Sequence, residues 1–228
     1  MDTTNKLENI FAASGEIASK DTDSVLLLNN GTTPDSPSTN AGLFSYFNAG
    51  IFGHPIPYAS ITVAQLHQII ISPSASLRHR CDATRTEFIA AGNSDTYKKL
   101  KQQLDHVAPA GIFAPWREAK YLQERSGILV LDFDHLPDLE AARTALLNDG
   151  FLKPEIALLF TSPSGEGLKV LIEADLSVSH LDNFNGYADY IAEQYASLGL
   201  IADRSGKDIA RACFLSYAPD AWLNPIFS

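Results

Sequence analysis

Cysteine, positive charge and long apolar runs are all scarce in this 228-residue chain, and each scarcity excludes a class of protein. The two cysteines, Cys81 and Cys213, lie far apart without metal-ligand spacing, which predicts free thiols in a reducing cytoplasm. The longest apolar runs cover a few residues, far short of the about 20 that cross a bilayer. The N-terminus, MDTTNKLENIF, lacks the basic and apolar regions of a signal peptide. We therefore expect a cytoplasmic protein with no membrane partner.

The shortage of positive charge argues against strong non-specific binding to nucleic acid, which depends on neutralising phosphates. The net charge is −10 and the pI is near 4.9. The charge is uneven, however. Residues 78–125 hold nine Lys/Arg against six Asp/Glu, a net of +3, whereas residues 126–228 carry −9. A mildly basic middle suits a weak template contact beside a metal site, although charge alone favours a solvated surface.

The length and the change of pattern along the chain predict one domain with an N-terminal extension. Residues 1–42 are polar and rich in turn formers, so we expect a flexible or loosely packed extension. Residues 43–228 should form the folded domain. Its first part, 43–110, is predicted to be an α-rich helical lead-in, with a capping box at Thr62. Its second part, 111–228, is predicted to be the catalytic core.

Strands alternate with helices in the predicted core. Continuous aliphatic runs predict buried strands, and apolar residues at helical spacing predict helices between them. The predicted strands are Gly127–Phe133, Ile156–Phe160, Leu168–Ile172 and Ala212–Tyr217. The second and third form a β-hairpin. We therefore expect an α+β fold, with one compact sheet that has an antiparallel component and helices packed on it.

The first motif that carries chemistry is LVLDFD, at residues 129–134. Side chains of a strand alternate between faces, so Asp132 and Asp134 should point the same way while Phe133 enters the core. Carboxylates this close repel each other, and metal coordination relieves the repulsion. Hard oxygen ligands suit Mg²⁺ or Mn²⁺. A bare motif of this kind fits two solvated acids at a strand end equally well.

The second motif is the loop TSPSGEGLK, at residues 161–169. Its glycines allow backbone N–H groups to face inward as an anion nest, and Ser162, Ser164 and Lys169 add donors. This chemistry fits a triphosphate. Taken singly, the loop fits a glycine-rich hairpin turn with a surface lysine better.

The third motif is DRSGKDIAR, at residues 203–211. Asp203 could complete a two-metal site, and Arg211 could neutralise phosphate charge as it develops. The alternative is a solvated turn held by local ion pairs, which stabilise a fold little.

The order and spacing of the three motifs resemble the archaeo-eukaryotic primase superfamily. The sequence is most similar to its primase-polymerase branch, and within it to the domain of the VirE N-terminal type, found in bacterial mobile-element and phage-like proteins. The matching stretches are SGILVLDFDHL, LLFTSPSGEGLKV and DRSGKDIARACFLSYAPDAWLNP. Weaker similarity extends the resemblance over Leu43 to Pro225. It implies an RRM-like sheet core with a helical extension. It also implies a metal-dependent nucleotidyltransferase, a DNA primase or polymerase, in the replication of a mobile element or phage-like DNA.

The resemblance also implies a role for each matching position. Asp132, Asp134 and Asp203 would be the catalytic acids and the ligands of Mg²⁺ or Mn²⁺. The phosphates of the incoming nucleotide would be bound by Ser162, Ser164, Gly165, Gly167, Lys169, Lys207 and Arg211. The implied substrates are nucleoside triphosphates and a single-stranded DNA template, and a helicase domain or protein is a candidate partner.

One position departs from the family pattern. Many members place a histidine where this chain has Lys169, and a lysine still holds phosphate as a point charge. The change nevertheless suits an alternative, a catalytically inactive module that binds nucleotide or single-stranded DNA on the same fold. The third acid is also open, because Asp208 lies close enough to compete with Asp203.

Two further hypotheses come from single stretches of residues. LVLDFD followed by LLFTS resembles the haloacid-dehalogenase phosphatases, with Asp132 as nucleophile and Asp134 as acid/base. That family expects Thr or Val in place of Leu136 and a later pair of adjacent acids, which the sequence lacks. Separately, Trp116 and Arg117 are candidate template contacts, since single-strand binders stack bases on aromatic rings. Tryptophans pack in cores more often.

Overall fold

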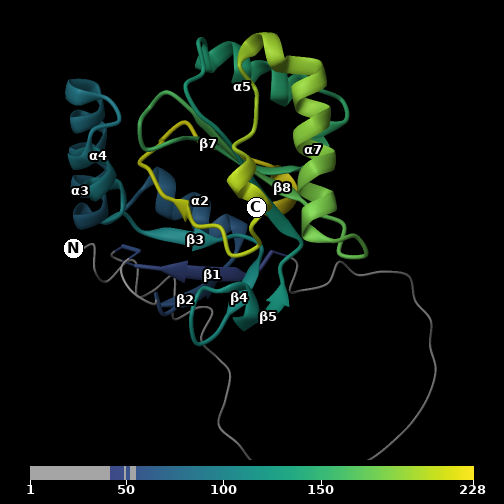
Figure 1. Cartoon of the computed structure of the whole chain (residues 1–228), viewed down its shortest axis with the longest axis horizontal. Helices are drawn as coiled ribbons and strands as arrows, with labels where there is room; N and C mark the ends of the chain where they lie inside the picture. The colour runs from purple at the N-terminus through teal and green to yellow at the C-terminus, as the bar shows by residue number, and fades with distance from the viewer. Residues whose placement is uncertain (1–41, 49, 52–54) are drawn as a thin grey trace, which may run out of the picture.

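The computed structural model describes residues 42–48, 50–51 and 55–228 (Figure 1). The predicted extension over residues 1–42 falls outside the described residues, apart from Gly42. Among the described residues, no helix combines the length and apolar character that crossing a membrane requires.

The described strands form three antiparallel sheets. The first sheet has the order β2 (Ala59–Ile61), β1 (Phe44–Phe47), β3 (His106–Ala108) and β9 (Cys213–Phe214). The second has the order β10 (Trp222–Leu223), β7 (Ile156–Thr161), β8 (Leu168–Glu173) and β6 (Ile128–Phe133). The third pairs β4 (Gly111–Phe113) with β5 (Leu122–Arg125). The α+β class and the antiparallel hairpin of β7 and β8 are thus confirmed.

The helices divide between the two halves of the chain. The first half holds α2 (Val63–Ile71), α3 (Ala75–Ala91) and α4 (Asp95–Lys101), and the second holds α5 (Leu139–Asn148), α6 (Leu152–Glu155) and α7 (His180–Tyr195). The capping box at Thr62 is present, with the Thr62 side chain accepting from the Gln65 N–H. The capping box accepts hydrogen bonds from backbone N–H groups at the start of α2 that have no partner within the helix, and so fixes where that helix begins.

The second sheet is packed on both of its faces, and strand β6 shows how. Leu129, Leu131 and Phe133 lie in one core cluster with residues of α5 and α7. Ile128 and Val130 lie in another, with residues of α2 and the first sheet. This alternation follows from the two-residue period of a strand. The second sheet therefore lies between α5 and α7 on one side and α2 with the first sheet on the other (Figure 1).

Residues 43–110 hold α2, α3 and α4, and they also contribute β1, β2 and β3 to a sheet. One detail of the predicted organisation was wrong. The predicted strand Ala212–Tyr217 is reduced to Cys213–Phe214, and it pairs with β3 in the first sheet instead of joining a single compact sheet. Strands of two to four residues leave too short a pattern for periodicity to identify.

Gly206 allows the 3₁₀ turn η3 (Arg204–Lys207) to pack tightly between α7 and β6. A Cβ there would lie 2.5 Å from Phe184 Cε2 and 3.1 Å from the Val130 carbonyl oxygen. We expect Gly206→Ala to lower the free energy of unfolding by about 1–3 kcal/mol, measured in urea, because overpacking forces neighbours to shift. Gly186→Ala is the matched control, since Gly186 lies inside α7 with nothing within 4 Å of its Cβ position. It should gain about 0.5–1 kcal/mol, and equal losses from both variants would contradict the packing argument.

His106 makes the stability of the fold pH-dependent. Its ring is buried, lies stacked on Phe47 at 4.7 Å between centroids and also contacts Phe214. Burial, with a smaller effect from the positive charge of Arg117, lowers the pKa of His106 from 6.5 to about 3. The unfolded chain therefore binds this proton first, so stability that is complete above pH 6.5 is lost as the pH falls toward 3.

We expect His106 to contribute about 1.4 kcal/mol of unfolding free energy per pH unit inside that window. In His106→Phe this contribution should vanish from urea unfolding curves measured between pH 6 and pH 4. His79→Gln, at an exposed position of α3, should leave the slope unchanged. An unaltered slope in His106→Phe would show that other groups control acid unfolding.

Candidate active site

The centre of the candidate site is a buried ion pair between neighbouring strands. Asp132 of β6 lies directly opposite Lys169 of β8 in the antiparallel register. Lys169 Nζ is 2.5 Å from Asp132 Oδ2, and the two side chains are 3% and 13% exposed. Burial alone would lower the pKa of Lys169, but Asp132 outweighs it and the pKa lies above its usual value. Lys169 therefore carries its charge throughout the neutral range.

The other oxygen of Asp132 points to a cation site. Asp132 Oδ1 is buried and has no hydrogen-bond partner among the described residues. Asp134 follows directly after the end of β6 and is exposed. A buried carboxylate oxygen without a partner is costly, and a divalent cation would relieve that cost. Mg²⁺ is usually bound by one or two carboxylates together with water and substrate phosphates, so Asp132 and Asp134 fit it.

Asp203 lies beside this pair but is engaged differently. Its N–H donates to the Asp132 carbonyl at 2.8 Å, so the chain at Asp203 covers the outer edge of β6. Its carboxylate accepts from Arg211 Nη2 at 3.0 Å and from the Ser205 hydroxyl at 2.5 Å. Burial raises the pKa of Asp203, but the hydrogen bonds of Ser205 and the charge of Arg211 bring it below its usual value.

Asp203 is therefore adjacent to the acidic strand end without joining a ligand set. In the part of the chain that the structure describes, no three acidic, histidine or cysteine side chains gather closely enough to hold a metal. The competing acid, Asp208, is exposed and accepts from the Ala210 N–H at 3.0 Å. The backbone contact to Asp132 makes Asp203 the nearer candidate for a third acid.

The glycine loop between β7 and β8 lies against the acidic strand end. A Cβ on Gly167 would be 2.3 Å from the Phe133 carbonyl oxygen and 3.3 Å from Asp134 Cα, so only glycine permits this approach. Gly165 has a positive φ of 87°. Its N–H already donates to the Ser162 carbonyl at 3.0 Å, while the hydroxyls of Ser162 and Ser164 lie 2.9 Å apart. The loop thus offers hydroxyl groups beside the carboxylates, and it uses the backbone N–H groups of Ser162, Gly165 and Glu166 internally.

Sequence reasoning missed the contributions of α3 and α4 to this site. Arg85 of α3 donates from Nη2 to the Ser162 carbonyl at 3.2 Å. Tyr97 of α4 is buried, and burial followed by the charge of Asp134 raises its pKa. Lys101 follows Tyr97 by four residues, on the same face of α4, with its ammonium 5.9 Å from the Tyr97 ring centroid. The spacing of Tyr97 and Lys101 was visible in the sequence, but nothing local indicated which strand they would face.

The candidate template contacts lie apart from the acids. Arg117 donates from Nη1 to the Ala210 carbonyl, and burial lowers its pKa. It therefore supports the backbone next to Arg211. Trp116 packs edge-on against Tyr121, with 5.3 Å between ring centroids. Lys207 is exposed on η3. Neither Trp116 nor Arg117 is brought to the glycine loop by any hydrogen bond or ring contact among the described residues.

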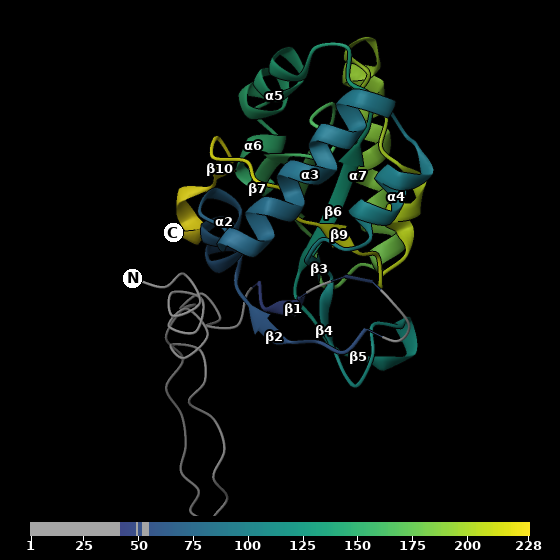
Figure 2. The same ribbon diagram turned by 90° about the vertical axis from the view of Figure 1, so that its left-hand side faces the viewer.

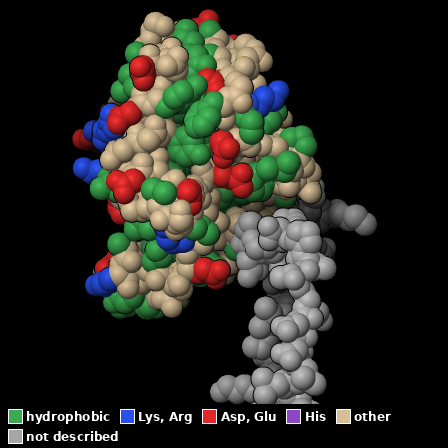
Figure 3. All heavy atoms as spheres, turned by 90° about the vertical axis from the view of Figure 1, so that its right-hand side faces the viewer, with side chains coloured by type: hydrophobic (Ala, Val, Ile, Leu, Met, Phe, Trp, Pro, Cys, Tyr) green, Lys and Arg blue, Asp and Glu red, His purple; other side chains and the backbone are tan. Residues whose placement is uncertain are grey.

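A hollow separate from the candidate site lies on the side of the molecule that carries α7. It has a volume of about 370 Å³ and is lined by residues that include Phe151, Tyr187 and Tyr190. Figure 3 shows this side, with hydrophobic side chains gathered along its middle and acidic ones beside them. None of the lining residues belongs to the acidic strand end or the glycine loop.

Comparison with known proteins gives one match. A family model described as "BT4734-like, N-terminal domain" matches residues 99–222. The matched range contains Lys101, Asp132, Lys169 and Asp203, and it begins after α3. No curated protein and no solved structure matches the chain.

Breaking the central ion pair should cost much more than breaking an exposed one. Asp132→Asn leaves the Lys169 ammonium buried without a counter-ion, so we expect the free energy of unfolding to fall by about 3–5 kcal/mol. Asp132→Asn/Lys169→Met should lose less than the two single changes added together, because no charge is left unpaired.

The control is the exposed pair of Arg78 and Asp82, which lie 2.8 Å apart with side chains 46% and 55% exposed. Asp82→Asn should cost less than about 1 kcal/mol. Urea unfolding at pH 7 measures the wild type, Asp132→Asn, Lys169→Met, the double variant and Asp82→Asn. Strict additivity in the double variant would mean that Lys169 and Asp132 are not coupled.

Proposed function

The chain belongs to the BT4734-like N-terminal domain family, and we propose that this domain is a metal-dependent nucleotidyltransferase of the primase-polymerase type. The proposal includes an RRM-like core. The arrangement of β6, β7 and β8 supports it, because β8 lies between the two strands that α5 and α6 connect. Strand β10 adds to the sheet beside β7, so β6 lies at its edge.

The observation that carries the proposal is the meeting of three distant segments at one end of β6. The acidic pair Asp132 and Asp134, the serine-glycine loop and Asp203 with Arg211 are joined by backbone contacts. Together they offer carboxylates for a divalent cation and donors for phosphate oxygens. That combination suits transfer of a nucleotidyl group, which depends on positioning and charge stabilisation.

Different residues would bind the metal and the phosphates. Asp132 Oδ1 and Asp134 would hold Mg²⁺ or Mn²⁺, which when bound supplies positive charge beside the reacting phosphate. Ser162 and Ser164 offer hydroxyl donors to phosphate oxygens. Arg211 would contribute to the leaving pyrophosphate the N–H donors that its bond to Asp203 leaves unused, and Asp203 holds its guanidinium at 3.0 Å. We assign Asp203 this orienting role alongside its predicted role as third acid.

The proposed substrates are nucleoside triphosphates, added to a growing strand on a single-stranded DNA template. The setting would be replication of a mobile element or phage-like DNA, with a helicase domain or protein as partner. The overall negative charge implies a weak template contact that a partner would strengthen.

A second candidate function is binding without catalysis. It is favoured by the 2.5 Å contact between Lys169 and Asp132, because the ammonium neutralises an oxygen that a metal would otherwise use. Such a module would bind nucleotide or single-stranded DNA and release it unchanged.

Incorporation of labelled nucleotides on primed and unprimed single-stranded templates, with Mg²⁺ or Mn²⁺, tests the proposal. Asp134→Asn is the sharpest variant, because Asp134 is exposed and its loss should not unfold the chain. We expect incorporation to fall by at least about 100-fold, since a metal contributes several kcal/mol of charge stabilisation. Glu193→Gln, at an exposed position of α7, should incorporate as the wild type does.

The outcomes separate the candidates. Product in the unprimed lane would identify a primase, and product in the primed lane alone a polymerase. Full activity in Asp134→Asn would contradict the assigned site. Tight nucleotide binding without product would favour the binding module, and wild-type protein that binds neither nucleotide nor single-stranded DNA would exclude both.

A further inference from the structure

Two of the three cations that the sequence assigned to phosphate are neutralised within the site, and the third, Lys207, is exposed on η3. Lys169 is paired with Asp132 at 2.5 Å, and Arg211 is paired with Asp203 at 3.0 Å. A triphosphate brings several negative charges, and a cation already bound to a carboxylate has little net charge left to offset them. Other positive groups must therefore face the phosphates if this site binds a nucleotide.

Helices α3 and α4 are fixed against the same end of the second sheet. Arg80 of α3 forms an ion pair with the buried Asp105 at 2.5 Å. Phe88 of α3 stacks on His135, which follows Asp134, with 6.4 Å between centroids. Figure 2 shows α3 and α4 lying across the view of β6 and β9. The helical pair is thus a wall of the site, since its contacts reach both the acidic strand end and the glycine loop.

Arg85 contacts the glycine loop directly. Beyond its bond to the Ser162 carbonyl, its Nε would be 3.4 Å from a Cβ on Gly165. The side chain is half-buried, and no carboxylate among the described residues forms an ion pair with it. A guanidinium has five N–H donors in a planar fork that matches phosphate. Arg85 therefore has donors and net charge available beside the loop.

Lys101 faces the same space from α4. Its side chain is half-buried, and within the described part of the chain it has no carboxylate partner within 4 Å. Burial lowers its pKa, the charge of Lys169 lowers it further, and Asp132 and Asp134 act in the opposite direction. The Lys101 ammonium lies over the Tyr97 ring and has no carboxylate partner among the described residues, so its charge is available to an anionic ligand.

We propose that Arg85 and Lys101 are the principal phosphate-binding cations of this site, and that they hold the triphosphate of the incoming nucleotide between the α3–α4 wall and the glycine loop. The inference rests on the proposed function and extends it, because it places the phosphates on the side of the helical lead-in. It also explains why the positive charge of the chain gathers over residues 78–125.

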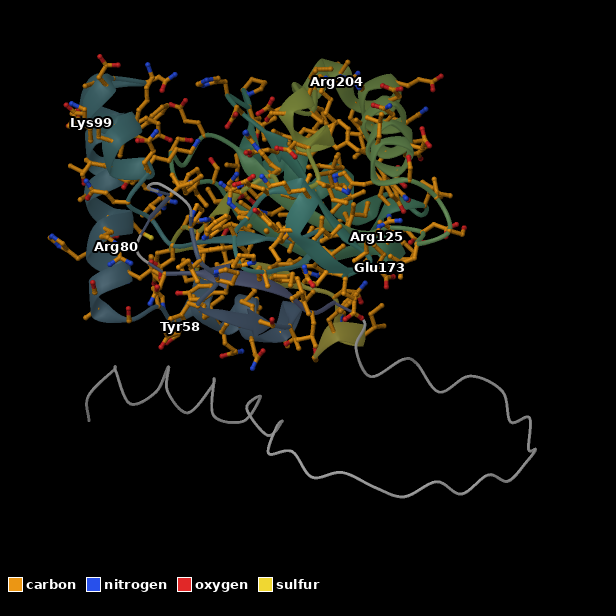
Figure 4. All side chains as sticks on the ribbon, turned by 60° about the horizontal axis from the view of Figure 1, so that its bottom comes forward. Tyr58, Arg80, Lys99, Arg125, Glu173 and Arg204 are labelled. Atoms are coloured by element: carbon orange, nitrogen blue, oxygen red, sulfur yellow. The ribbon has the colours of Figure 1, made fainter. Side chains whose placement is uncertain are left out.

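Calorimetric titration of the full chain with dATP and Mg²⁺, and separately with inorganic tripolyphosphate, tests this inference. Lys101→Met and Arg85→Met should each weaken both ligands about tenfold, the loss of one charge-assisted contact. Lys101→Arg should restore most of the affinity. Lys99→Met is the matched control, because Lys99 is exposed at the outer edge of the same helix (Figure 4) and should bind as the wild type does.

Each outcome has a separate meaning. Wild-type affinity in both Lys101→Met and Arg85→Met would overturn this inference and leave the proposed function standing. An equal loss of affinity in Lys99→Met would show a general effect of positive charge and would also overturn the inference. If wild-type protein binds neither ligand, the proposed function fails with it. Arg85→Lys keeps the positive charge beside the loop. Affinity retained in this variant would show that Arg85→Met loses a phosphate contact, whereas affinity lost in both would indicate a disturbed loop.

Discussion

The ion pair of Lys169 and Asp132 is the constraint on which the rest of the site depends. The two residues face each other across β6 and β8, on the face opposite Leu131, Phe133 and Val170. A slip of one residue in β6 would move Asp132 into the cluster under α5 and α7 and separate it from Lys169. The packing that fixes the register of the sheet therefore also places the charged pair.

Other parts of the site attach to this pair through the backbone. The Asp203 N–H binds the Asp132 carbonyl, and the loop at Gly167 lies against the Phe133 carbonyl. Backbone contacts constrain geometry more tightly than long side chains, whose rotamers must be ordered at an entropic cost. The arrangement leaves the side chain of Asp134 exposed beside the loop.

The sequence predicted the elements whose patterns are long. Strands β6, β7 and β8 lie within a few residues of where the aliphatic runs indicated. The short strands β1, β2 and β3 of the first sheet were not predicted, because pairing between distant segments creates them and local periodicity does not. For the same reason the motifs identified Asp132, Asp134 and Lys169 but not Arg85 or Lys101. The last two join the site only through the packing of α3 and α4.

The position of β6 at the margin of its sheet has a consequence for solubility. An edge strand presents unpaired N–H and C=O groups that can pair with another chain, and β6 is almost wholly apolar. At that edge the Asp203 N–H donates to the Asp132 carbonyl, and the carboxylates of Asp132 and Asp134 lie at the end of β6. The segment that shapes the candidate site thus also protects the edge of the second sheet from pairing with another chain.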